Sequence, residues 1–251
     1  MCTVTYIPGE RNNFILGHNR DERIDRPMAT PPLPRMINGQ KVIYPVDPEG
    51  KGTWIGISAG RRLACLLNGG TKKHERMPPY RHSRGLVIPA YFTYKGVEEF
   101  SVHFDFSGLE PFTLITIEEE RMFALVWEDE TLNLKEKNPG LPHIFFSHSL
   151  YPKESLESRT ADFYNWYLNN RDAGEKDLLN YNLNQIFESD RIVKYDTGKY
   201  ILKTVSISVI DFSENITRFH YYDTLNDIHL TNGLEIKSLT SEMSKYLQVC
   251  A

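Results

Sequence analysis

The chain has 251 residues, of which 40% are hydrophobic and 25% are charged, and its formal net charge is -4. This composition is ordinary for a globular protein. The chain carries no basic stripe, which argues against a nucleic-acid-binding protein. No apolar run reaches the roughly 20 residues of a membrane-spanning helix. We expect one domain over residues 1–251, with a small-molecule substrate or ligand, no nucleic-acid partner and no membrane span.

The N-terminus and the cysteines bear on the cellular compartment. The first residues lack the basic and apolar regions of a signal peptide. Cys2, Cys65 and Cys250 are odd in number and far apart in the chain. Their spacing matches neither a disulfide framework nor a metal-binding motif such as CxxC. We therefore expect unpaired thiols, no metal site and a reducing, cytoplasmic compartment.

The N-terminal third predicts strands. CTVTYIP and NFILGHN are joined by the turn-rich GERNN, which indicates an antiparallel hairpin. The proline-rich RPMATPPLPRM follows, and we expect an irregular loop there because proline fixes φ and lacks a donor. Three further strands are predicted in VIYPVD, TWIGISAG and RLACLLNGG. The last is almost wholly apolar, which is typical of a strand covered on both faces.

The rest of the chain predicts helices between strands. Two short helices are expected in HSRGLVIPAYFTY, with Ser83 as its cap and a kink at Pro89, and in VEEFSVHF. Apolar residues at helical spacing predict two longer helices in KESLESRTADFYNWYLNN and EKDLLNYNLNQIFES. Strands are predicted in PFTLITI, MFALVWE, HIFFSHS, YILKTVSISVIDF and ITRFHYYDT, the last two as a hairpin. The tail LEIKSLTSEMSKYLQ fits either a strand or a helix.

This order predicts an α+β fold. Strands, then helices, then strands indicate helices packed on stacked and mostly antiparallel sheets. The helices fall in the middle of the chain, so the N-terminal hairpin and the late strands can lie side by side.

Cys2 is the first candidate for chemistry. If Met1 is removed, Cys2 carries both a thiol and a free α-amino group, which is a nucleophile with a base attached. The alternative is a small half-buried residue at the start of a strand.

The densest polar cluster is His18-Asn19-Arg20-Asp21-Glu22-Arg23, at the end of the second predicted strand. In an antiparallel hairpin this end returns beside Cys2. A carboxylate there can hold an α-ammonium group, and an arginine or a histidine there favours a thiolate. The alternative is a charged turn with local ion pairs.

Two further positions are singled out by their context. Asn68 follows an apolar strand and precedes Gly69-Gly70, so its amide and nearby backbone N–H groups could form an oxyanion hole. An Asn-Gly turn explains the same residues. His148, in FFSHSLYP, is the other histidine besides His18 with a positional argument. The sequence contains no HExxH, GxGxxG or P-loop motif.

Several motifs together resemble one family. After the start MCT, the chain carries Asn19-Arg20-Asp21-Glu22, Arg26-Pro27, GTWIGIS at 52–58, Asn68 and Arg84-Gly85. This pattern resembles the NRDE family, also called the transport and Golgi organization family. The resemblance covers most of the chain and is most specific over its first 90 residues.

That family is similar to the cysteine-type N-terminal nucleophile hydrolases, which implies a four-layer αββα sandwich. It implies Cys2 as the residue that attacks an amide, Asp21 as its support and Asn68 as an oxyanion donor. Two positions depart from the hydrolases. His18 stands where they have an arginine, and Ser147-His148 stands near a second asparagine.

Two functions follow from the resemblance and the residues. The first is hydrolysis of a non-peptide C–N amide bond of a small molecule, with Cys2, Asp21 and Asn68 as catalytic residues and no cofactor required. The second is a non-catalytic binding protein or chaperone on the same fold, for haem or another hydrophobic small molecule, since the family is linked to haem trafficking. His18, Asn19, Arg20 and His148 are the expected binding residues.

Overall fold

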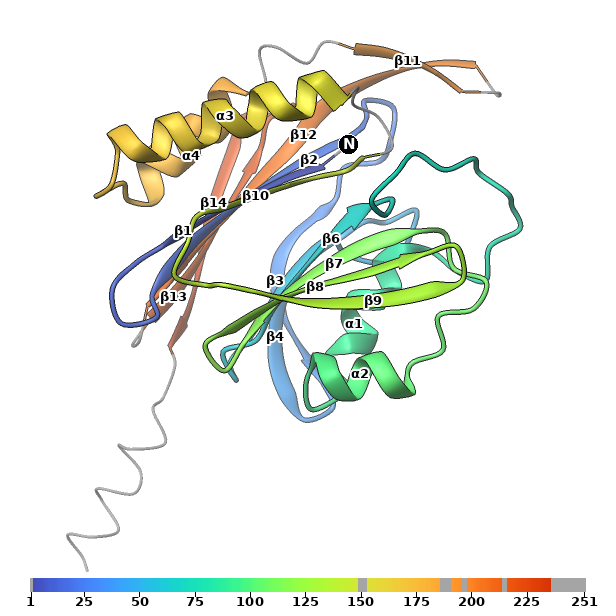
Figure 1. Cartoon of the computed structure of the whole chain (residues 1–251), viewed down its shortest axis with the longest axis horizontal. Coiled ribbons are helices and arrows are strands. Elements are labelled where there is room, and N and C mark those ends of the chain that lie inside the picture. Colours follow the sequence, from blue (N-terminus) through green and yellow to red (C-terminus); the bar gives the residue numbers. More distant parts are fainter. Residues whose placement is uncertain (1, 149–152, 186–190, 196–197, 214–215, 236–251) are drawn as a thin grey trace, which may run out of the picture.

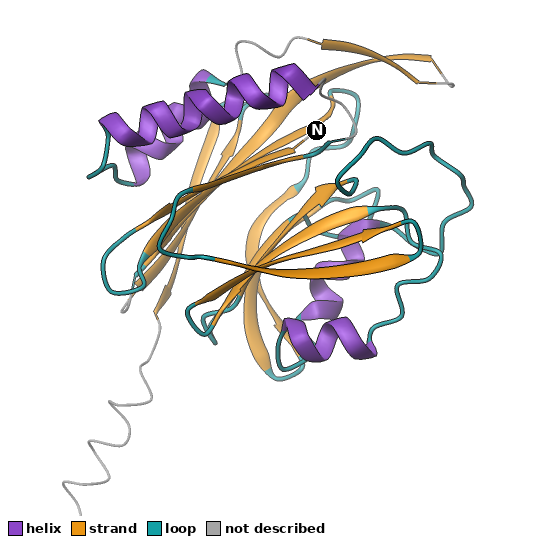
Figure 2. Ribbon diagram, in the orientation of Figure 1, coloured by secondary structure: helices purple, strands orange, loops and turns teal. Residues whose placement is uncertain are grey.

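Two antiparallel sheets lie face to face, and helices cover the outer face of each (Figures 1 and 2). The structure is a computed structural model that describes residues 2–148, 153–185, 191–195, 198–213 and 216–235. Each sheet has seven strands. The arrangement from one side to the other is helices, sheet, sheet, helices, so the predicted αββα layers are confirmed.

The first sheet joins the N-terminal hairpin to the late strands. Its strand order is β10-β1-β2-β12-β13-β14, and β11 pairs with the first residues of β12, from Gly198 to Leu202. The strands are β1 (Cys2–Pro8), β2 (Phe14–Arg23), β10 (His143–Phe146), β11 (Arg191–Tyr195), β12 (Gly198–Phe212), β13 (Ile216–Asp223) and β14 (Ile228–Glu235). The predicted pairing of early with late strands is therefore confirmed at β2 and β12.

The second sheet is a meander, in which each strand pairs with the next one along the chain. Its strands are β3 (Thr30–Ile37), β4 (Gln40–Val46), β5 (Ile55–Ser58), β6 (Leu63–Asn68), β7 (Phe112–Glu118), β8 (Arg121–Glu128) and β9 (Thr131–Lys137). Short loops suffice for most of these connections, because antiparallel neighbours need only a turn between them.

The helices bury their apolar sides on the outer faces of the sheets. Over the first sheet lie α3 (Lys153–Asn169) and α4 (Glu175–Asn184), whose Phe163 and Leu178 pack with Ile7. Over the second sheet lie the short 3₁₀ turn η1 (Arg84–Leu86), α1 (Val87–Tyr91) and α2 (Val97–His103). None of the described helices has both the length and the apolar character of a membrane span.

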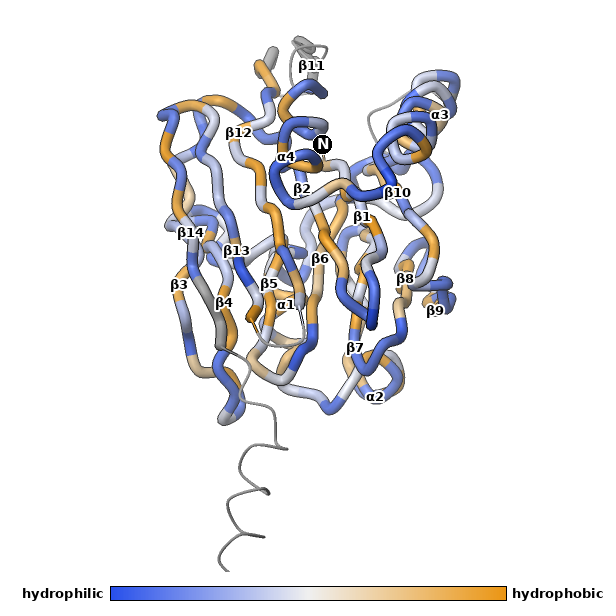
Figure 3. The backbone as a smooth tube through the Cα atoms, turned by 90° about the vertical axis from the view of Figure 1, so that its left-hand side faces the viewer, coloured by the Kyte–Doolittle hydropathy of each residue, from blue (hydrophilic) through white to orange (hydrophobic). Residues whose placement is uncertain are grey.

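The space between the sheets is the main hydrophobic core. Val4 and Leu16 of the first sheet meet Ile57 and Leu63 of the second there. Figure 3 shows the hydrophobic stretches concentrated along the central strands. β6 contributes alternate residues to this core and to the core beneath α1, which confirms a strand covered on both faces.

The proline-rich stretch is irregular over residues 26–29, as predicted, but forms a strand from Thr30 onward, where the predicted loop is wrong. Residues 30–37 form β3, which pairs with β4 from Leu33 to Ile37. β3 is an edge strand, where a proline without an N–H group leaves no ladder bond unmade. The pairing is irregular between Thr30 and Leu33, where Pro31 and Pro32 lie.

Smaller differences follow from weak sequence signals. The prediction contained neither β9, an edge strand with mostly exposed polar residues, nor β11. The first predicted helix is shorter than expected and is split into η1 and α1, with Ser83 capping η1 through a bond from the Gly85 N–H. The tail contributes its first two residues to β14, and residues 236–251 lie outside the described part of the chain.

Candidate functional site

The β1–β2 hairpin places the N-terminal residues beside the polar cluster. Cys2 pairs with Arg20, and Thr3 pairs with Asn19. β12 runs along the other side of β2, with a register irregularity between Thr204 and Ser206, next to Asp21. The tetrapeptide of residues 19–22 thus belongs to a central strand and the side chains of its first three residues are buried. The alternative of a surface turn is wrong.

A cavity of about 160 Å³ opens at this end of the two sheets. Both sheets and the connecting loops contribute to its wall. Its lining includes Cys2, Arg20, Asp21, Glu22, Arg26, Asp47, Trp54, Asn68, Ser83 and Arg84. The three residues that the sequence predicts as catalytic, Cys2, Asp21 and Asn68, therefore meet at one cavity. We call it the Cys2 cavity.

The Cys2 side chain is almost entirely buried, at 6% exposure. Burial raises the pKa of its thiol, and the Asp21 carboxylate raises it further. The backbone N–H of Asp21 and the Arg20 guanidinium act in the opposite direction. Since the pKa stays raised, the thiol is protonated at neutral pH, and a base must remove its proton before it can act as a nucleophile.

Asp21 is held by a strand from the far end of the chain. Its Oδ1 accepts a hydrogen bond from Thr204 Oγ1 at 2.5 Å. Burial raises the pKa of this carboxyl group, although the Thr204 hydroxyl and nearby cationic groups oppose the rise. The residue is 8% exposed, as expected for a group that orients a partner and not for surface decoration.

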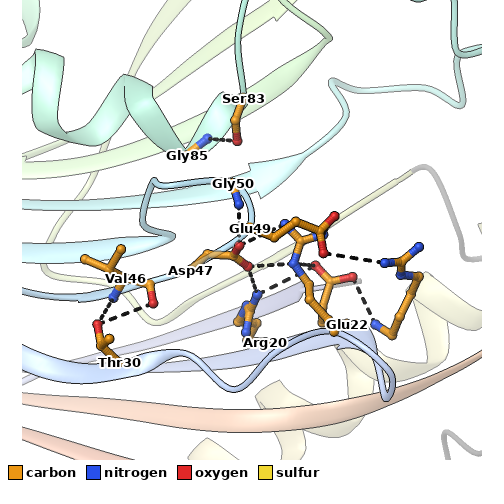
Figure 4. A network of polar contacts seen from close by, with 11 residues as sticks. Arg20, Glu22, Thr30, Val46, Asp47, Glu49, Gly50, Ser83 and Gly85 are labelled. Carbon is orange, nitrogen blue, oxygen red and sulfur yellow. Dashed lines mark hydrogen bonds and ion pairs between the residues drawn. The ribbon is translucent and has the colours of Figure 1, made fainter.

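Arg20 is fixed in place by a network of charges (Figure 4). Its guanidinium lies 4.2 Å from the centre of the Trp54 ring and forms an ion pair with Asp47. Arg26 also contacts both oxygens of Asp47, at 2.6 and 3.0 Å. The Gly50 N–H donates to the same carboxylate at 2.6 Å. Burial opposes ionisation of Asp47, but these partners hold the pKa of its carboxyl group below the usual range.

Asn68 ends β6 and reaches the cavity from the second sheet. Its backbone carbonyl accepts a hydrogen bond from the Ser147 hydroxyl at 2.6 Å. The Ser147 N–H donates to the Cys2 carbonyl at 3.0 Å. Ser147 therefore links the two sheets directly beside the thiol. The neighbouring Gly69 N–H donates to the Pro111 carbonyl at 2.9 Å, so this N–H group is not available as an oxyanion donor.

Arg84 is one of the residues at this cavity that sequence reasoning missed. Its guanidinium pairs with Glu110 at 3.1 Å and donates to the Pro111 carbonyl at 3.1 Å. Burial lowers the pKa of Arg84, whereas Glu110 and the Cys2 thiolate favour its charged form. Arg84-Gly85 was visible as a motif, but the motif alone gave no indication that it faces Cys2.

Two glycines bring Arg84 to the cavity. The Thr53 N–H donates to the Gly85 carbonyl at 2.9 Å, which joins the GTW loop to the 3₁₀ turn. A Cβ atom built on Gly52 would lie 2.3 Å from the Gly85 carbonyl carbon. Only glycine at position 52 permits this backbone contact, which explains why a glycine precedes Thr53-Trp54.

His18, Asn19 and His148 line neither the Cys2 cavity nor a second cavity beside it. His18 pairs with Val4, one row deeper between the sheets, and is fully buried. Asn19 points to the opposite face, because side chains alternate along a strand, and its Nδ2 donates to the Asn182 carbonyl at 3.0 Å. His148 is half-buried, and burial lowers the pKa of its ring.

Among the described residues, the thiols of Cys2 and Cys65 are both unpaired and buried, and Cys250 lies outside that part of the chain. Within the same residues, no three His, Cys, Asp or Glu side chains gather into a group that could hold a metal ion.

The chain matches the family model of Transport and Golgi organisation 2 over residues 1–230. A search of the curated proteins finds no match. Two of the similar solved structures are a mutant and a variant of the conjugated bile acid hydrolase from Clostridium perfringens. The mutant has a TM-score of 0.57 at 10% identity, covering 94% of this chain and 92% of that chain. The variant has a TM-score of 0.55 at 11% identity, and the match covers 93% of this chain and 92% of that chain.

A third similar structure is the Caenorhabditis elegans ortholog of N-acylethanolamine-hydrolyzing acid amidase. Its TM-score is 0.51 at 11% identity, and the match covers 83% of this chain and 92% of that chain. At these identities the three structures establish the fold, which is that of N-terminal nucleophile hydrolases.

Proposed function

Because the chain belongs to the Transport and Golgi organisation 2 family and has the fold of amide hydrolases, we propose that it hydrolyses a non-peptide C–N amide bond of a small molecule. One observation carries this proposal. Cys2, Asp21 and Asn68 come from three separate strand ends and line one cavity with a buried thiol. An enzyme of this kind needs these groups together.

The proposed reaction begins with removal of Met1, which exposes the α-amino group of Cys2. This amine, with an ordinary pKa of about 7.7–8.0, takes the thiol proton. The sulfur then attacks the amide carbonyl, and the Asn68 amide stabilises the oxyanion. The C–N bond breaks as the ammonium returns its proton to the leaving amine, which leaves a thioester on Cys2. Water hydrolyses the thioester and releases the acid and the free thiol.

Asp21 has a supporting role in this scheme. Its carboxylate lies beside Cys2 and raises the pKa of the thiol, so it does not itself favour the thiolate. An anionic group at that place instead favours the protonated amine, which forms when the thiol loses its proton. Arg20 and Arg84 provide the cationic surroundings that a thiolate requires.

The test combines intact mass with a panel of small acyl amides. We expect loss of Met1 and turnover of at least one amide by the purified chain. Cys2→Ala should abolish turnover and trap no acyl group. Cys65→Ala is the matched control, because Cys65 is also a buried unpaired thiol but does not line the cavity. Retention of Met1, or equal turnover by Cys2→Ala, would disprove the proposal.

A second candidate function is binding of a hydrophobic small molecule without turnover. The raised pKa of Cys2 favours it, because a protonated thiol is a weak nucleophile. Haem is one ligand to test by titration. His18 and His148 line neither the Cys2 cavity nor the second cavity beside it, so haem binding in either of these cavities would depend on other ligands. Saturable binding by a chain that retains Met1 would support this function over hydrolysis.

A further inference from the structure

A second cavity, of about 230 Å³, lies next to the Cys2 cavity. Arg20, Glu22 and Arg26 line both. The two cavities therefore share a wall made of the charge network around Asp47. A molecule that extends from Cys2 into the second cavity would contact these three side chains.

The polar groups of this second cavity are already occupied. Glu22 contacts Arg20 at 3.7 Å and Arg26 at 3.6 Å. Opposite them, Asp223 is buried, and its Oδ1 accepts hydrogen bonds from the Leu225 and Asn226 N–H groups, both at 3.0 Å. A charged or strongly polar ligand group would have to break these bonds, which makes such an occupant unfavourable.

Arg23, Tyr221 and Asn226 also line this cavity, and Arg23 is paired with Asp25 at 3.5 Å and with Glu49 at 3.6 Å. The other residues of the wall and the mouth are apolar. Ala29 and Val205 are buried in the wall, whereas Ile24, Met28 and Leu225 are 41%, 59% and 47% exposed. Large apolar side chains that gather at the rim of one cavity indicate a binding site for an apolar group.

We propose that the second cavity receives a compact apolar substituent of the amide that Cys2 cleaves. This inference rests on the proposed function and narrows its substrate class to amides with an uncharged apolar group close to the scissile bond. The volume sets the size of the group, because a cavity of about 150 Å³ is sufficient for benzene. A ring or a branched chain of similar or slightly larger size fits, whereas a charged group does not.

The test uses the Cys2 thiol as a reporter and requires no turnover. N-methyl-, N-propyl-, N-cyclohexyl- and N-benzylmaleimide are reacted with the full chain, and the rate at Cys2 is followed by peptide mass. Each rate is divided by that of the same reagent with glutathione. Each buried methylene adds up to about fourfold. We expect the cyclohexyl and benzyl reagents to gain at least about tenfold over the methyl reagent.

Two exposed methionines provide a matched pair of variants. Met28→Glu places a charge at the mouth of the second cavity and should remove most of the gain. Met36→Glu changes a methionine that is 68% exposed on β3 and lines neither cavity, so it should keep the gain. The proposal is overturned if the larger maleimides react with the parent chain no faster than the methyl reagent, or if both variants lose the gain in rate equally. A failure of N-methylmaleimide to react at Cys2 also overturns it, since the thiol would then not face the cavity.

The same data separate this inference from the proposed function. If no amide is cleaved but the gain and its loss in Met28→Glu hold, hydrolysis is disproved and the apolar subsite stands. If amides are cleaved regardless of their substituent and the gain is absent, the subsite is disproved and hydrolysis stands.

Discussion

The two ends of the space between the sheets differ in chemistry although one strand, β2, runs through both. At one end Phe14 stacks on Phe212 with ring centres 4.5 Å apart, and Leu16 is fully buried in the apolar core. At the other end the same face carries His18 and Arg20. Side chains alternate identically along the whole strand. The change from core to site thus comes from residue type and not from backbone geometry.

The polar end also contains buried polar atoms that lack a hydrogen-bond partner among the described residues. Trp54 Nε1 and Ser208 Oγ are buried and have no hydrogen-bond partner among the described residues. Such atoms are rare in protein cores, because each one costs free energy. Buried polar atoms without a partner are expected at functional sites, because residues kept there for their chemistry can lower the stability of the fold. The comparison predicts that substitutions at the apolar end affect stability alone, while those at the polar end affect stability and Cys2 together.

The largest effect is expected for Asp47→Asn. It removes the buried carboxylate that Arg20 and Arg26 share, although Glu22 still contacts both, and breaking a buried ion pair costs about 3–5 kcal/mol. The pKa of Asp47 is lowered in the folded state, so its contribution is complete above the ordinary aspartate pKa of about 3.9. It is lost as the pH falls through the lower folded value. Denaturant unfolding should show the parent and the variant converging in acid; a gap independent of pH would contradict this assignment.

Leu16→Ala should lower the free energy of unfolding by about 2–5 kcal/mol, because it opens a cavity in the apolar end. The rate at which iodoacetamide modifies Cys2 in the folded protein should not change. A large change in that rate would show that the two ends are mechanically coupled and that the comparison is too simple.

Asp21→Asn should cost about 1–3 kcal/mol, since the amide matches its buried partners poorly. It also removes a negative charge that raises the pKa of Cys2, so iodoacetamide should modify the thiol faster at neutral pH. Unfolding and alkylation are measured on the same preparation. If both are unchanged, Asp21 has no part in a working site.

Arg84→Met should have the smallest effect on stability, because Glu110 keeps His74 and Arg76 as partners. Loss of the cation should move the pH profile of Cys2 alkylation to higher pH and slow it severalfold at neutral pH. Arg84→Lys should keep most of the parent profile. Arg81→Met, which removes an arginine paired with Asp105 away from the cavity, is the control and should leave the profile unchanged.

Patterns that repeat along the chain predicted the fold well. The strand-like CTVTYIP and NFILGHN and the turn-rich GERNN between them predicted the hairpin, and the apolar run of β6 predicted its burial on both faces. β3 was missed because its prolines are tolerated only on an edge strand, and a sequence does not show which strand is an edge. The prediction that residues 1–251 form one domain stays a prediction.

The site was predicted in part. Cys2 and Asp21 could be predicted together, because an antiparallel hairpin places the start of β1 beside the end of β2. Arg84 and Ser147 could not be placed in the same way, since they approach Cys2 through contacts between the sheets. The sequence grouped His18 and Asn19 with Asp21. In the structure His18 lies deeper between the sheets, and the Asn19 side chain bonds to Asn182 on the side of α4, so neither lines the cavity.

The bond from Thr204 to Asp21 also sets an order of events during synthesis. β2 emerges from the ribosome early, yet its neighbour β12 comprises residues 198–212, nearly the last part of the described chain. At about 5–20 residues per second, the N-terminal hairpin waits roughly 10–40 seconds for this neighbour. Throughout that time the first residues cannot be enclosed by their own sheet. Enzymes that process a nascent N-terminus therefore have access to Cys2 before folding conceals it.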